Sequence, residues 1–287
     1  MRTPRPGLTL LEMTIVLTIL AVLTTLAITL ADGTIDQARF DATRRQLQTI
    51  QDAILGPAGQ PDSASFVADV GRLPLVGANP DDPLPELTSP MLPAGMLAFA
   101  ARNATEDTDV VLYCGWRGPY ASFSVGPTGL RDGWGQQFVA TTQPTSAGAA
   151  LLNLASIGGP NAPYAGQPMS LPTPLTGLAW SGPLAGNLVV HSNSGTAPAN
   201  LSVRLFVPDM TEADGVRMLS PSSGDPTPSG GNVVSYPFSF ASVPMGLVAL
   251  RAYQGLGPDK SNTPSTVSYV RLTPRGTPAR EIHLYIP

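Results

Sequence analysis

A single carboxylate interrupts an otherwise apolar run close to the start of the chain. Glu12 is the only charged side chain within Leu8–Leu30. A carboxylate at the centre of a membrane costs about 2.5–3.5 kcal/mol on insertion scales, so such residues usually serve a function. Because a buried charge is tolerated only where it is paired, Glu12 is the first candidate functional residue of the chain.

Histidine and cysteine, which often bind metals or take part in catalysis, are scarce. The chain has two histidines, His191 and His283, and one cysteine, Cys114. One cysteine excludes an intrachain disulfide and a cysteine-rich metal site. Both histidines fall in expected strands and are interpreted as ordinary strand residues, and Cys114 is interpreted as a small buried hydrophobic residue. We therefore expect no metal and no cofactor.

Two acidic clusters, Asp81-Asp82 and Glu106/Asp107/Asp109, fall in expected loops and are interpreted as solvated surface. The segments rich in Ser and Gly match neither a nucleophile elbow nor a phosphate-binding loop. The sequence therefore predicts that the protein is not an enzyme.

The composition favours short strands and many turns. The 287 residues suffice for one large domain or two modest ones. Only 13% of them are charged, while 29 are Gly and 31 are Pro. The formal net charge is −4 and no basic stripe is present, so we expect no nucleic acid as a partner.

The apolar run is long enough to cross a membrane. As a helix, Leu8–Leu30 spans about 35 Å, against about 30 Å for a hydrocarbon core. Arg2 and Arg5 precede it, and Asp32 and Asp36 follow it. This asymmetry predicts a cytoplasmic N-terminus, with the bulk of the chain on the other side of the membrane.

Two simpler interpretations of the run exist. One is a cleaved secretory signal peptide, with Thr29-Leu30-Ala31 as its cleavage site, and the other is a plain signal anchor. The run exceeds the usual 7–15 apolar residues of a signal peptide. Neither interpretation gives Glu12 a role.

Gly7, followed by Leu8-Thr9-Leu10-Leu11-Glu12, resembles the processing site of type IV pilins and type II secretion pseudopilins. The resemblance implies that residues 1–7 are a leader, which prepilin peptidase removes after Gly7. Leu8, where the family usually has Phe, would then be the N-methylated first residue. Glu12 would neutralise the new amine of a neighbouring subunit and set the axial register of a filament.

The polar continuation of this run also has a helical pattern. In the expected amphipathic helix 34–55, Phe40, Leu47 and Ile54 recur every seven residues and form a narrow apolar seam. Gly56-Pro57 ends the pattern. The sequence predicts one long helix from Thr9 to Leu55, half in the membrane and half packed on a globular head.

Two stretches of the head, residues 31–165, extend the resemblance. "GWRGPY" (Gly115–Tyr120) resembles the Gly-Pro-Tyr turn that precedes the family's sheet, and "LRDGWGQQFVA" (Leu130–Ala140) resembles the start of one of its strands. Turn chemistry and aromatic anchors that cover the small sheet against the helix are expected at these residues: Trp116, Asp132, Trp134 and Gly135.

The loop that often holds calcium in major pseudopilins corresponds to Ser156–Asn161. It contains no carboxylate, and calcium needs six to eight oxygen ligands. No calcium site is expected there.

The last part of the chain has a different pattern. Short alternating runs bounded by Gly, Pro, Asn or Ser predict a separate, antiparallel β-sandwich over residues 178–287, after a Pro-rich linker, 166–177. Its Val243-Pro244-Met245-Gly246 turn resembles carboxypeptidase-regulatory-like sandwiches, which are generally accessory modules. The fold class is therefore α+β, with a long helix on a small antiparallel sheet and a separate all-β domain.

These features together predict a pseudopilin-like structural subunit of a type II secretion or type IV pilus-like machine, in a bacterial inner membrane, with its bulk in the periplasm. The expected partners are prepilin peptidase, other pseudopilin subunits and, as a candidate, secreted cargo. The alternative is a membrane-anchored or secreted extracytoplasmic binding module with no filament role.

Overall fold

The computed structural model describes residues 10–57, 60, 64–79, 82–89, 91–93, 95–122, 130–159, 164–176, 179–195, 198, 200–221, 227–254, 263–272 and 280–287. Gly7 and Leu8, the proposed processing site, lie outside these residues, as does the rest of the leader.

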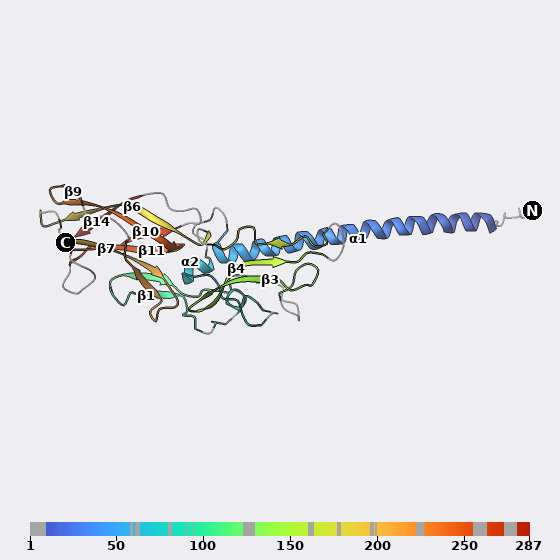
Figure 1. Ribbon diagram of the computed structural model, residues 1–287, viewed down its shortest axis with the longest axis horizontal. Coiled ribbons are helices and arrows are strands. Elements are labelled where there is room, and N and C mark those ends of the chain that lie inside the picture. Colours follow the sequence, from blue (N-terminus) through green and yellow to red (C-terminus); the bar gives the residue numbers. More distant parts are fainter. Residues whose placement is uncertain are drawn as a thin grey trace, which may run out of the picture.

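One helix dominates the shape of the molecule. Helix α1 (Leu10–Leu55) has 46 residues and projects from the remaining elements, with the C-terminus at the opposite end of the molecule (Figure 1). Its second half packs on the head through Leu47, Ile50 and Ile54, each at most 1% exposed. Gly56, with a φ of 87°, ends the helix in the left-handed conformation that glycine adopts readily.

The head combines short helices with two small sheets. Strands β1 and β2 form an antiparallel pair, and β3, β4 and β5 form an antiparallel sheet in that order. These elements are α2 (Phe66–Val70), α3 (Pro85–Thr88), β1 (Ala100–Asn103), β2 (Val111–Cys114), β3 (Val139–Thr145), β4 (Gly148–Ser156) and β5 (Met169–Ser170).

The C-terminal part is a sandwich of two sheets. One sheet has the order β14-β6-β10-β9, and the other has the order β12-β11-β7-β8 with β13 paired to β11. Its strands are β6 (Ser181–Ser192), β7 (Leu201–Pro208), β8 (Val216–Leu219), β9 (Thr227–Gly230), β10 (Val233–Pro244), β11 (Gly246–Gln254), β12 (Thr263–Pro264), β13 (Ser268–Leu272) and β14 (Arg280–Ile286).

The sandwich is not wholly antiparallel. Strand β14 runs parallel to β6, with Ile282 opposite Leu188 and Leu284 opposite Val190. The alternation of apolar residues identifies the face of a strand that is buried, and this face is the same for either strand direction. The sequence pattern therefore could not distinguish parallel from antiparallel pairing of β14.

The sandwich is not a separate domain either. Phe206 of β7 and Ala249 of β11 belong to the same buried cluster as Ile50 of α1. Their sequence neighbours Leu205 and Leu250 lie in the core between the two sheets. Both strands are therefore buried on both faces, which explains the nearly continuous apolar run of β11.

Residues 166–176, the described part of the segment expected to be a linker (166–177), belong to the head. Its strand β5 pairs with the end of β4, and Leu171 and Leu175 are buried in the core of the head. Their backbone amides donate to the carbonyls of Leu154 and Leu152. The segment therefore extends the sheet instead of joining two independent modules.

The shared core predicts cooperative unfolding of head and sandwich. Phe206→Ala removes a fully buried ring, which costs about 3–5 kcal/mol. Urea unfolding of the detergent-solubilised chain, followed by tryptophan fluorescence, should show one transition that shifts as a whole. Two transitions, with the tryptophan signal of the head unchanged by the substitution, would contradict a common core.

Candidate assembly surface and the contacts that position it

The first half of α1 presents apolar side chains to all sides. Within it, Leu10–Ala27 has a mean hydropathy of 2.2 and no buried residue, and among the described residues it is the one stretch long and apolar enough to span a membrane. Its large exposed side chains are Leu10, Leu11, Met13, Ile15, Val16, Leu17, Ile19, Leu20, Val22, Leu23 and Leu26.

The threonines of this stretch direct their hydroxyl groups to the helix backbone. Thr14 and Thr18 donate to the carbonyls of Leu11 and Thr14, at 2.8 and 2.7 Å. Thr24 and Thr25 donate in the same way to carbonyls four residues earlier. These bonds satisfy the hydroxyl hydrogens within the helix, which suits an apolar environment.

Glu12 is exposed in the first turn of α1. Ile15 and Val16, one turn further along the same side, are 51% and 47% exposed. The carboxylate thus belongs to a surface that is otherwise apolar, where pairing with a cation would be strongly favoured over isolation. Gly7 and Leu8 lie outside the described residues, so the geometry between them and Glu12 is not defined.

A tight turn after residue 131 holds α1 in place. The backbone N–H of Gly133 donates to Thr43 Oγ1 at 2.9 Å, and Trp134 Nε1 donates to Asp36 Oδ1 at 3.3 Å. A Cβ on Gly133 would lie 2.3 Å from the carbonyl oxygen of Arg39. Glycine is therefore required here because the turn and the helix backbone approach closely.

Asp132 organises this turn. Its Oδ1 accepts from the backbone N–H groups of Trp134 and Gln136 at 2.9 and 2.8 Å, and its Oδ2 accepts from Ser156 Oγ at 2.6 Å. Gly135 completes the turn with a φ of 80°. The buried carboxylate therefore joins the turn to β4, the central strand of the head sheet.

Trp116 has a different place from the one expected. Its indole is 7% exposed, and its Nε1 donates to the carbonyl of Glu86 in α3 at 2.7 Å. Its ring meets Tyr120 edge-on. Of the two tryptophans predicted to cover the sheet against the long helix, only Trp134 bonds to α1, while Trp116 anchors α3.

Asp69 carries the most clearly perturbed carboxyl group among the described residues. Burial raises its pKa to about 6, although Arg117 and the Tyr120 hydroxyl stabilise the charged form. Arg117 Nη2 lies 3.1 Å from Asp69 Oδ1, and Tyr120 donates to Oδ2 at 3.2 Å. This group joins α2 to the segment after β2.

The raised pKa of Asp69 predicts a pH-dependent contribution to stability. The folded state binds the proton more tightly than the unfolded state, so the free energy of unfolding falls as pH rises from about 4 to about 6. Asp69→Asn removes this titration. Urea unfolding near pH 4 and near pH 7 should show the substituted protein gaining stability relative to the natural one at the higher pH. A difference independent of pH would contradict the assignment.

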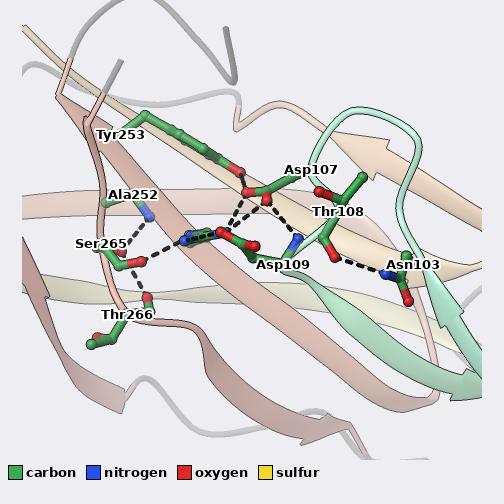
Figure 2. A network of polar contacts seen from close by, with 9 residues as sticks. Asn103, Asp107, Thr108, Asp109, Ala252, Tyr253, Ser265 and Thr266 are labelled. Carbon is green, nitrogen blue, oxygen red and sulfur yellow. Dashed lines mark hydrogen bonds and ion pairs between the residues drawn. The ribbon is translucent and has the colours of Figure 1, made fainter. Parts of the chain in front are cut away.

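A buried ion pair joins the head to the sandwich. Arg251 of β11, which is 6% exposed, donates through Nη1 to both oxygens of Asp107 at 2.7 Å and through Nε to the carbonyl of Ser265 at 2.8 Å. Tyr253 also donates to Asp107, and Figure 2 shows this carboxylate at the centre of the network. Asp107 comes from the loop between β1 and β2, so the pair joins residues of the two halves of the chain.

The acidic cluster around this loop was expected to be solvated, and for Asp107 this is wrong. Its side chain is 10% exposed, whereas that of Asp109, 3.3 Å from Arg251, is 72% exposed. A short loop has no periodic sequence pattern from which the burial of one carboxylate and the exposure of another could be predicted. Arg251 and Tyr253, both distant in sequence, compensate the burial of this charge.

The two carboxylates give a matched pair of substitutions. Asp107→Asn should lower the free energy of unfolding by about 3–5 kcal/mol because it leaves Arg251 buried without its main counter-charge. Asp109→Asn should cost less than about 1 kcal/mol because that carboxylate is largely in water. Urea unfolding of both variants tests the ranking, and equal losses would show that the buried pair has no special role.

Among the described residues, no group of three or more His, Cys, Asp or Glu side chains is placed to hold a metal ion. Cys114 is free and buried, as expected, and burial raises the pKa of its thiol to about 11. The two histidines lie together, with His191 Nε2 3.1 Å from His283 Nδ1. The sequence does not reveal this pair, because the two histidines meet only through the parallel pairing of β14 with β6.

Comparisons of the chain with models of protein families, with curated proteins and with solved structures found no match.

Proposed function

We propose that this protein is a pseudopilin-like structural subunit of a type II secretion or type IV pilus-like machine. The observation that carries the proposal is the form of α1. Its first half is apolar and uncovered, and the same unbroken helix continues into a half that is fixed on a head. An assembly subunit needs both properties, since one half must contact lipid or other subunits while the other holds the head.

In this proposal, the chain is inserted in a bacterial inner membrane with its N-terminus in the cytoplasm. Prepilin peptidase cuts after Gly7, and Leu8 becomes the methylated first residue. The new amine is a cation in an apolar environment, where it requires a counter-charge. Glu12 of a neighbouring subunit supplies that charge, and the pair fixes the axial offset between the two helices.

The head and the sandwich give the subunit its periplasmic surface. The turn at Asp132 fixes α1 on the head, and the Arg251–Asp107 pair fixes the sandwich on the head. The sandwich lies at the far end of the molecule from the apolar half of α1 (Figure 1). On a filament it would project outward, where secreted cargo is its candidate partner.

A second candidate is a membrane-anchored or secreted binding module without a filament role. The position of the apolar helix near the N-terminus favours it, because a signal sequence or a simple anchor has the same length and composition. Such a protein has no need of Gly7 or Glu12.

The intact mass of the protein recovered from bacterial membranes distinguishes the two functions. We expect a chain that lacks residues 1–7 and carries one added methyl group on Leu8, and Gly7→Ala should leave the full-length chain. A chain that begins near Asp32 would instead support the secreted module.

Assembly is tested separately by crosslinking in membranes. Glu12→Gln keeps the size of the side chain and removes the charge, so it should abolish crosslinked multimers while cleavage continues. Met13→Ala, at the next position of the same exposed apolar segment and about 100° around the helix, is the control and should assemble. Multimers that form equally with both variants would contradict the assembly role of Glu12.

A further inference from the structure

The two histidines of the chain, 92 residues apart in sequence, are neighbours on the outer face of the sandwich. His191 is near the end of β6, and His283 is in the parallel strand β14. In the register of the two strands, His191 lies opposite Tyr285 and His283 lies opposite Val189. The facing ring nitrogens, His191 Nε2 and His283 Nδ1, are 3.1 Å apart.

An aromatic ring and a carboxylate flank the pair. The Tyr285 ring stacks on His191 with 4.8 Å between centroids and an interplanar angle of 17°. Glu281 Oε1 lies 3.7 Å from Nε2 of His283, the nitrogen that faces away from His191. With its proton on Nε2, the side facing Glu281, His283 would present the lone pair of Nδ1 toward His191.

We propose that His191 and His283 form a two-imidazole binding site for a divalent transition metal ion of the zinc or copper type. Neutral imidazole nitrogens are preferred ligands of these ions. The outer nitrogen of a ligating histidine usually faces a carboxylate, a carbonyl or water, and Glu281 lies on that side of His283 at ion-pair distance, 3.7 Å.

The separation of the two nitrogens fits one ion. With metal–nitrogen distances of about 2.0–2.1 Å, a separation of 3.1 Å corresponds to an angle at the metal of about 100°. This is between the values for square-planar and tetrahedral coordination. Binding requires His191 to carry its proton on Nδ1 and both rings to turn until their lone pairs converge. The His283 side chain is 49% exposed, so it has room to turn.

The site supplies two protein ligands, and water completes the coordination of the ion. It therefore has fewer ligands than a structural zinc site, which has four. A bound ion would connect β14 to β6 and so stabilise the pairing of these two parallel strands. Ligation of the folded state alone stabilises that state in proportion to the logarithm of the metal concentration over Kd.

Titration of the full chain with zinc tests the site. The protein in detergent micelles, stripped of metal by a chelator, is titrated with ZnCl2 by calorimetry. We expect one ion per chain, and a Kd at least about tenfold weaker for His191→Gln and for His283→Asn, which replace an imidazole by an uncharged amide of similar reach. Glu281→Gln leaves both ligands in place and should weaken binding less than the loss of either imidazole, because this carboxylate lies 3.7 Å from Nε2 and is 64% exposed.

Tyr269→Phe is the control, because this exposed tyrosine lies on β13 in the other sheet, and the variant should bind zinc as the natural protein does. Copper supplies a second readout, since the electron paramagnetic resonance spectrum of one equivalent of Cu²⁺ should show coupling to two imidazole nitrogens. Equal zinc affinity in the double variant His191→Gln/His283→Asn, or the absence of saturable binding to the natural chain, would overturn the proposal. Neither result depends on whether the protein forms filaments.

Discussion

The attachment of α1 to the head is the constraint on which the rest of the structure depends. The described stretch Leu10–Ala27 of this helix has no buried residue, so the direction of the helix depends on how its second half is held. The apolar seam of the helix supplies the buried contact area with the head. The turn at Asp132 fixes the direction in which the helix leaves the head. Gly133 approaches the helix backbone so closely that no larger residue fits, and its N–H bonds to Thr43. A buried carboxylate, itself bonded to Ser156, keeps the turn in that shape.

The head is in turn stabilised from the other side by the sandwich. Strands β7 and β11 serve two cores at once, with Leu205 and Leu250 facing one and Phe206 and Ala249 facing the other. The buried Arg251–Asp107 pair lies across the same junction. Apolar packing provides most of the area buried at this junction. The ion pair tolerates little movement of the sandwich relative to the head, because both charges are removed from water. The two halves of the chain therefore form one body.

Features set by local pattern could be predicted from the sequence. The long helix follows from an apolar run and a seven-residue seam that ends at Gly56, and the alternating residues Leu201 to Val207 of β7 do bury one face in the core of the sandwich. Features set by contacts distant in sequence could not. The direction of β14, the burial of Asp107 by Arg251 and the meeting of His191 with His283 all depend on which strands become neighbours. The Pro-rich composition of 166–177 suggested a linker, whereas two leucines in it fill the core of the head.

One residue of α1 gives this arrangement a mechanical property. Gly33 lies in the uncovered part of the helix, three positions before Asp36, where the contacts with the head begin. A Cβ built on it would meet nothing within 4 Å, so no packing demands glycine there. Glycine in a helix interior weakens the helix by about 1 kcal/mol relative to alanine. The helix that leads from the head into the proposed membrane segment is therefore weakened at Gly33, close to its attachment to the head. A load applied to the tip of the helix would be absorbed there as bending, before it could strain the joint between the helix and the head.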